Sequence, residues 1–323
     1  MWQFRCVHKD VLNRIRQTGY KMMKHRFFFV AMVACMLMNS CSKDGFQGDN
    51  GNEPIEVSTV DVTVHTAFSM SEDAWSATRA VTAADAAISR IVLSVFDAAG
   101  KKVKEVAQRQ GDSDFGDFSS FRLPMGTYQF VAVAHMTAST DKGNVQISSP
   151  TLAIIPDAPV GNTFACVQQV TVAGYQTQDV TLDLKLCVTD LMIKAMDVIP
   201  SDVKNVELVV NSGQQEATTL AFNPTTGLFN GNHSFSRTWD ASTAAGKAGA
   251  SFSVIAFLEA YPKMVSAVIR AYDAEGEKLY ERTFDNLTLK RATKLVVSTN
   301  LFTGSIAPSL SFEEWSVENV TKP

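Results

Sequence analysis

The sequence predicts an all-β fold, because three features of its patterning agree. Apolar and polar residues alternate with a period of two over many short stretches that are rich in β-branched residues, as they do in half-buried strands. Clusters of Gly, Asp, Asn and Pro separate these stretches where the chain needs turns. No segment after the N-terminal region carries a long apolar stripe with the 3.6-residue period of a helix, so β-sandwiches are the expected architecture.

The expected strands share this alternation, and turn residues lie between them. They are residues 57–66, 88–96, 126–135, 164–172, 180–186, 206–211, 252–258, 265–272 and 295–301. One further stretch, residues 74–87, is rich in alanine but also contains Ser and Thr, and it has room for one short helix.

Two hairpins in the sequence resemble each other, at residues 93–105 and 269–281. Each combines an alternating strand, a turn of the form aromatic-Asp-Ala-x-Gly, and a charged returning strand. Glycine suits a turn position with positive φ, and the Asp side chain can bond to its own turn. Either a common hairpin has arisen twice, or two related β-sandwiches stand in tandem. The second interpretation gives domains at residues 55–178 and 179–323.

The N-terminal region has the features of an export signal. Cations at Lys24 and Arg26 precede an apolar run at residues 27–38, which is 12 residues long. A membrane-spanning helix needs about 20 apolar residues, so this run fits the apolar part of a secretory signal. Residues 1–20 have no such run and are interpreted as an upstream extension, so residues 1–40 are left out of the fold prediction.

A cysteine stands immediately after the apolar run, in Met38-Asn39-Ser40-Cys41. This order resembles a relaxed bacterial lipobox, in which the chain is cut between Ser40 and Cys41 and the sulfur of Cys41 carries the lipid. The alternative is an ordinary signal peptide with a chance cysteine. The polar, Gly-rich and Asn-rich residues 41–54 read as a flexible tether, which would hold the folded body roughly 20 Å from the membrane.

The mature chain is acidic. Removing residues 1–40 takes away seven of the 29 Lys and Arg and one of the 33 Asp and Glu, which leaves a net charge of −10. This charge argues against binding nucleic acid, which needs a basic surface, and against adsorption to anionic lipid. Contact with the outer membrane then depends on the lipid at Cys41.

The sequence carries no signature of an enzyme. It has no Gly-x-Ser-x-Gly elbow, phosphate-binding loop or His-Glu-x-x-His motif, so no catalytic residue and no cofactor is predicted. Asp112, Asp114 and Asp117 share a loop but lack the spacing of an EF-hand, and no metal site is predicted. Cys166 and Cys187 are expected to be buried thiols, with a disulfide as the alternative.

Two features point towards assembly with other proteins. Arg79 and Ala80 lie in a small-residue stretch between the first and second expected strands, where an extended segment would be open to a trypsin-like protease. Near the C-terminus, large apolar side chains suit a strand that fills a groove in its own sheet or in a neighbour's. These candidate donor-strand residues are Leu310, Phe312, Trp315 and Val317.

The order of these motifs resembles the fimbrillin family, the pilus subunits of Bacteroidetes-type bacteria. The motifs are the lipobox, the Thr78-Arg79-Ala80 loop, the hairpin at residues 93–105, the step from Leu123 to Tyr128, the basic turn at residues 289–291 and the final strand. The resemblance implies two tandem transthyretin-like β-sandwich domains and export as a lipoprotein. It further implies that cleavage after Arg79 frees the first strand's groove in shaft subunits, whereas anchor subunits keep both lipid and strand.

The sequence therefore predicts a fimbrial subunit, pilus anchor or adhesin on the cell surface. Its expected partners are other pilus subunits, joined by strand exchange, together with a host or bacterial surface ligand. The alternative is a surface lipoprotein that binds polysaccharide through aromatic side chains at the sandwich edges, with Trp75, Trp239 and Trp315 as candidates.

Overall fold

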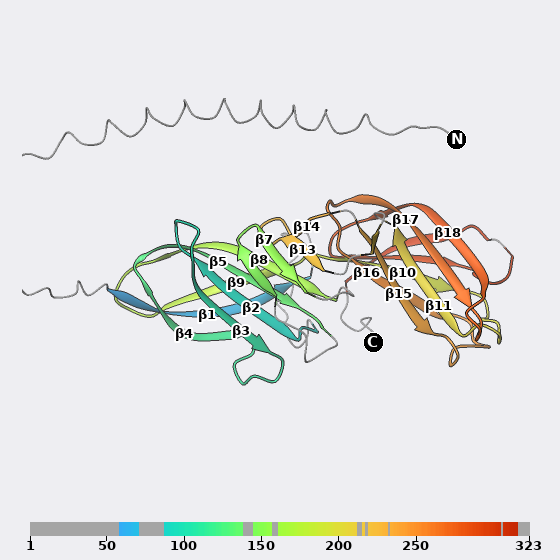
Figure 1. Ribbon diagram of the computed structural model, residues 1–323, viewed down its shortest axis with the longest axis horizontal. Helices are drawn as coiled ribbons and strands as arrows, with labels where there is room; N and C mark the ends of the chain where they lie inside the picture. The colour runs from blue at the N-terminus through green and yellow to red at the C-terminus, as the bar shows by residue number, and fades with distance from the viewer. Residues whose placement is uncertain are drawn as a thin grey trace, which may run out of the picture. The chain divides into compact units, whose positions relative to one another are not determined.

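The computed structural model describes residues 58–70, 87–137, 145–156, 161–211, 215–216, 219–231, 233–304 and 306–315 (Figure 1). Every regular element in these ranges is a β-strand, so the predicted all-β class is confirmed. No helix that could cross a membrane is found among the described residues. The apolar run at residues 27–38, the lipobox and the alanine-rich stretch up to Ala86 lie outside them.

The N-terminal half of the folded body is built on a seven-stranded sheet. Its order across the sheet is β3-β2-β5-β8-β9-β1-β4. The bounds are β1 (Thr59–Ser69), β2 (Arg90–Phe96), β3 (Lys102–Arg109), β4 (Asp117–Pro124), β5 (Gly126–His135), β8 (Thr163–Val172) and β9 (Gln178–Leu186). Neighbours pair antiparallel except β1 and β9, which run parallel.

The C-terminal half contains two further sheets. A four-stranded sheet has the order β16-β10-β19-β20, and a five-stranded sheet has the order β12-β15-β11-β17-β18. The bounds are β10 (Thr189–Ala195), β11 (Asn205–Asn211), β12 (Gln215–Glu216), β15 (His233–Asp240), β16 (Ser251–Ala256), β17 (Lys263–Tyr272), β18 (Lys278–Leu289), β19 (Thr293–Thr299) and β20 (Ser309–Glu314). Aromatic contact joins the inner faces of these sheets, since Trp239 of β15 meets Phe252 of β16 edge-on at 5.5 Å.

A small fourth sheet connects strands from both halves. Its order is β14-β13-β7-β6, with bounds β6 (Gln146–Ser149), β7 (Leu152–Ile155), β13 (Leu220–Asn223) and β14 (Leu228–Phe229). The part of the chain from Glu56 to Pro323 is one compact unit by its contacts. A domain boundary after residue 178 would fall inside β9. This strand pairs with β1 from Gln178 to Lys185 and with β8 at Lys185 and Leu186. The tandem-domain organisation stays a prediction.

The alternation in the sequence explains most of these strands. In β9 the odd and even positions separate cleanly, so that Val180, Leu182, Leu184 and Leu186 are buried and the residues between them face out. Along β2 all seven residues are buried, because both faces of this strand are covered. Predicted and observed bounds agree at residues 126–135, and at most other strands they differ by one to three residues.

The two similar hairpins of the sequence have the same turn chemistry. Asp97 accepts hydrogen bonds on Oδ1 from the backbone amides of Ala99 and Lys101, and Asp273 does the same for Glu275 and Glu277. The glycine of each turn has positive φ, 77° and 82°. Both hairpins therefore form for the predicted physical reason: Asp satisfies the turn amides and Gly takes the left-handed backbone.

Candidate assembly site

The first strand, β1, lies inside the seven-stranded sheet and not at its edge. It pairs on one side with β9, from Val62 opposite Gln178 to Ser69 opposite Lys185, and on the other with β4. Figure 1 shows β1 in blue beside these strands. Its inward-facing side chains fill the core and are fully or almost fully buried; they are Val60, Val62, Val64 and Phe68. The strand is thus an integral part of the core.

Polar side chains attach β1 to its neighbours as well. His65 Nδ1 lies 2.7 Å from Asp117 Oδ1 at the start of β4. The Ser69 hydroxyl donates to Asp183 of β9 at 2.7 Å. These contacts are solvent-exposed, so each adds little to stability, and the buried apolar face carries the attachment.

Removing β1 would have two structural consequences. The four buried side chains would leave an apolar trough between β9 and β4. In the part of the chain that the structure describes, β4 pairs only with β1, so β4 would lose its whole ladder. Unpaired backbone groups and bare apolar surface are costly unless a strand refills the gap. Loss of β1 would therefore destabilise the sheet.

The predicted processing site lies in the connection between β1 and β2. Arg79 and Ala80 fall between Ser69 and Arg90, so a cut after Arg79 would separate β1 from the rest of the chain covalently. Ser40, Cys41, Arg79, Ala80 and Val317 all lie outside the described residues, and their roles stay predictions.

The last strand, β20, has the opposite character. It pairs antiparallel with β19 on one side and forms the edge of its sheet among the described strands. Leu310 and Phe312 stand opposite Val297 and Leu295, which belong to the core, yet 56% of Leu310 and 48% of Phe312 remain exposed. The ring of Phe312 lies 4.6 Å from Lys290 Nζ. An edge strand with exposed apolar side chains is a surface to which another strand can add.

Three of the four candidate donor residues are described, and they have different surroundings. Leu310 and Phe312 share one face of β20, since they are two positions apart. Trp315 follows the end of the strand and is only 8% exposed, so it packs into its own fold. The indole of Trp315 therefore has a buried position in the intact chain, and its role as a donor residue for another subunit stays a prediction.

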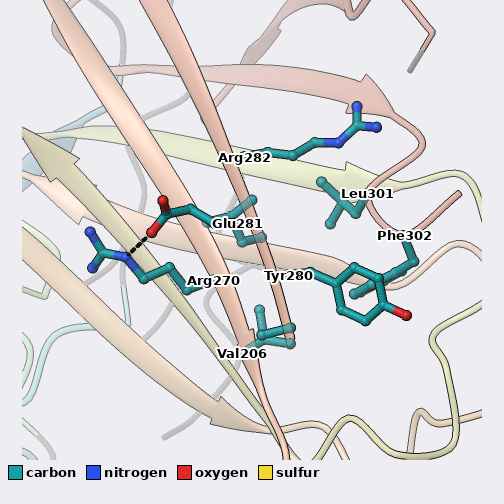
Figure 2. Close-up of a pocket in the computed structure, with 9 residues that line it drawn as sticks. Val206, Arg270, Tyr280, Glu281, Arg282, Leu301 and Phe302 are labelled. Carbon is teal, nitrogen blue, oxygen red and sulfur yellow. Dashed lines mark hydrogen bonds and ion pairs between the residues drawn. The ribbon is translucent and has the colours of Figure 1, made fainter. Parts of the chain in front are cut away.

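A small recess lies next to β17 and β18 (Figure 2). It is a shallow recess that is partly open to solvent, lined by side chains that include Val206, Tyr280 and Phe302. Arg270 Nε donates to Glu281 at 2.8 Å and its Nη1 donates to Glu207 at 3.0 Å. These hydrogen bonds to Glu281 and Glu207 raise the pKa of Arg270, so the guanidinium is held within the protein and is not offered to a ligand.

The other candidate residues of the sequence have structural surroundings. Asp112 accepts a hydrogen bond from the Arg109 amide at 2.7 Å, and Asp117 pairs with His65, so this loop uses its carboxylates internally. Within the described ranges no group of His, Cys, Asp and Glu is arranged to hold a metal ion. Trp239 is half-buried and packs in the core, while Trp75 lies outside the described residues.

Both cysteines of the folded body are free thiols. Cys166 is half-buried on β8, and Cys187 is fully buried in the connection between β9 and β10, so the expectation of unpaired thiols is confirmed. Burial raises the pKa of Cys166 to about 11 and that of Cys187 to about 12. Thiols with such pKa values are neutral at physiological pH and poor nucleophiles.

The sequence alone did not reveal a buried pair of charged side chains. Asp190 on β10 and Lys294 on β19 are register partners, and their side chains are only 6% and 2% exposed. Burial raises the pKa of Asp190 to about 7, although Lys294 and Arg237 act in the opposite direction. In the sequence each residue is a single charge at the start of an apolar stretch, in Thr189-Asp190-Leu191 and in Thr293-Lys294-Leu295. No local pattern connects these two segments.

Comparisons with solved structures give distant matches. The fimbrial anchor protein Mfa2 from Porphyromonas gingivalis matches at 9% identity and a TM-score of 0.48, over 80% of this chain and 99% of that one. A fimbrial assembly protein from Parabacteroides distasonis matches at 14% identity and a TM-score of 0.45, over 79% and 96% of the two chains. The tip fimbrial protein Mfa3 from Porphyromonas gingivalis matches at 14% identity and a TM-score of 0.45, over 80% and 100%.

The family comparison is decisive where the structural matches are too distant to carry an argument. Among curated proteins, none matches this sequence. Residues 56–320 match a protein family described as fimbrillin-A associated anchor proteins Mfa1 and Mfa2, which covers the folded body almost from end to end. The chain therefore belongs to the family of fimbrillin-A associated anchor proteins, as its motif order predicted.

Proposed function

We propose that this protein is a pilus-associated anchor or subunit at the bacterial surface, which joins other pilus subunits by exchange or addition of a β-strand. The family match over residues 56–320 supports the association with a pilus. The anchor role fits a chain whose first strand is built firmly into its own sheet. No step of this function needs a catalytic group or a cofactor.

The proposed attachment to the membrane depends on Cys41. In this proposal the lipid on Cys41 holds the protein in the outer membrane, and residues 42–54 separate the folded body from the bilayer. The acidic mature chain would not bind an anionic bilayer by charge, so the acyl chains supply the attachment.

The observation that carries the proposal is the contrast between β1 and β20. β1 occupies an interior position, next to the edge strand β4, with four buried side chains, whereas β20 is an edge strand with Leu310 and Phe312 about half exposed. In the intact chain the groove is filled, and the β20 edge is one of the sheet edges among the described strands to which another strand could add. After a cut at Arg79, the trough between β9 and β4 would also accept a strand, and the C-terminal segment of a second subunit is the proposed occupant.

Polysaccharide binding, the alternative from the sequence, has no comparable support. The described recess is small and internally ion-paired, Trp315 is buried in the core, and Trp239 is half-buried against it. We therefore retain strand exchange as the proposed mechanism.

The test compares three forms of the protein: the intact chain, the chain clipped after Arg79, and the clipped chain lacking residues 308–323. Each is incubated at high concentration and run on denaturing gels without boiling. Strand exchange predicts ladders from the clipped chain with its tail, because only this form has both an open groove and a donor.

Two outcomes decide against the mechanism. Equal ladders from the clipped chain without its tail would show that the C-terminal segment is not the donor. Ladders from the intact chain at the same rate would show that the groove of β1 is not the acceptor. An Arg79→Ala variant treated with the same protease is the matched control, since it keeps β1 attached.

A further inference from the structure

The buried pair of Asp190 and Lys294 has an arrangement that no part of the proposed function uses. The two residues lie directly opposite each other in the parallel pair of β10 and β19, so their side chains leave the same face of the sheet. Lys294 Nζ is 3.8 Å from Asp190 Oδ2, which is too far for a hydrogen bond. Neither Lys294 Nζ nor Asp190 Oδ1 has a hydrogen-bond partner.

Such a pair is unfavourable as two ions. Removing a carboxylate and an ammonium from water is repaid only when hydrogen bonds satisfy both groups, and here they do not. Burial raises the pKa of Asp190 to about 7, which favours its carboxylic acid form. Transfer of one proton from Lys294 Nζ to Asp190 would turn the ion pair into an amine beside a carboxylic acid. Both side chains are almost fully buried.

We propose that Lys294 Nζ and Asp190 Cγ join in an intramolecular amide bond, which cross-links β10 to β19. The lone pair of the amine attacks Cγ, the N–C bond forms, and the C–O bond to one carboxyl oxygen breaks. That oxygen leaves as water with its own proton and one proton from the amine, and no oxidant or reductant takes part. The product replaces two unsatisfied ionisable groups by one neutral amide.

The geometry of the sheet supplies the usual requirements of this condensation. Paired strands hold Lys294 Nζ 3.8 Å from Asp190 Oδ2, so the two groups are already neighbours and the entropy cost of bringing them together is reduced. Glu313 of β20, which is exposed at the edge of the sheet, is the register partner of Lys294, and its charge acts on Asp190. In our proposal Glu313 takes the proton from the attacking nitrogen and returns it to the leaving oxygen. Arg237 is the remaining charged group that acts on Asp190.

The bond would change how the fold carries force. β10 is the first strand of the C-terminal sheets and β19 adjoins the edge strand β20. With residues 190 and 294 joined, tension applied between the N-terminal half and β20 passes through the cross-link. The chain between these residues is then bypassed and need not unfold. This consequence rests on the proposed function, since a pilus component bears load, but the bond itself does not.

Peptide mapping of the full-length protein by mass spectrometry tests the proposal. Trypsin cuts after Lys185, Lys194 and Arg291, so the cross-linked chain yields residues 186–194 joined to residues 292–323. We expect this linked species at the sum of the two peptide masses less one water, with no cut after Lys294. If residues 186–194 and 292–294 are instead recovered as separate peptides of full mass from protein incubated at neutral pH, the proposal is overturned.

Variants separate the chemistry from the fold. Asp190→Asn should give a linked species of the same mass, because ammonia leaves in place of water. The double variant Asp190→Leu with Lys294→Met keeps the site apolar and should give no linked species; a linked species of the same peptides in this variant would overturn the assignment. Glu313→Gln should lower the linked fraction at early times at least several-fold, and an unchanged rate would overturn the role given to Glu313. The separate strand-exchange test is unaffected by any of these results.

Discussion

Replacing Phe68 by alanine tests whether β1 is an integral part of its sheet. Phe68 is 1% exposed, and its ring meets the ring of Phe164 on β8 edge-on at a centroid distance of 5.3 Å. The substitution removes a fully buried aromatic side chain and leaves a cavity that the surrounding strands fill only in part. For buried Phe→Ala changes the loss is about 3–5 kcal/mol in the free energy of unfolding.

The same substitution on β20 provides a matched control. Phe312 is 48% exposed at the edge of its sheet, so Phe312→Ala removes an equal side chain from a place where about half of it already meets water. Its remaining contacts are with Leu295 across the strand pair and with Lys290 Nζ over the ring. We expect a loss of about 1 kcal/mol, in the range of a cross-strand pair and an exposed cation–π contact.

Equilibrium urea unfolding followed by circular dichroism measures both changes. With a slope of about 1–3 kcal/mol per molar urea, Phe68→Ala should lower the midpoint by roughly 1 M or more, and Phe312→Ala by clearly less. Equal effects of the two substitutions would refute the contrast between an embedded first strand and an open last strand. A Phe68→Ala loss below about 1 kcal/mol would by itself show that β1 is loosely held, and the argument for a costly empty groove would fail.

Two further predictions concern titratable groups. Asp197 accepts hydrogen bonds from the amides of Leu301, Phe302 and Thr303 at 2.7–2.8 Å. Burial alone would raise the pKa of Asp197, but these hydrogen bonds have the larger combined effect and lower it. The carboxylate therefore stabilises the fold above the unfolded pKa of about 4, and this stabilisation is lost as the pH falls through the lower folded pKa. Asp197→Asn should lower the free energy of unfolding by about 1–3 kcal/mol at pH 7 and flatten the acid side of the stability–pH curve. An unchanged curve would contradict this. Cys187, buried with its pKa raised to about 12, should not react with a thiol reagent at pH 8 until urea unfolds the chain, and rapid labelling of the folded protein at Cys187 would contradict its placement.

The sequence alone predicted the features that depend on neighbouring residues. Alternation identified the all-β class and, for β5, its bounds, because each apolar position in a strand recurs after two residues whatever the strand pairs with. The Asp and Gly of the two hairpin turns were predicted for the same reason, since their bonds close within five residues. The edge strand with Leu310 and Phe312 was found from its own alternation. Strands of two to four residues, such as β12 and β14, were missed because they are too short to show a period.

What the tertiary structure decided was the choice of partners. The pattern of β1 says that one of its faces is buried, but only the folded chain places it between β9 and β4, whose paired residues lie more than 50 positions away. Trp315 looked like a donor side chain and is buried in its own fold. Asp190 and Lys294 are 104 positions apart, and either one alone is an ordinary charged residue near a turn. The period of a strand is a local property of the sequence. The choice of pairing partner depends on which distant strands bury the most apolar area together, and no single segment of the sequence contains that information.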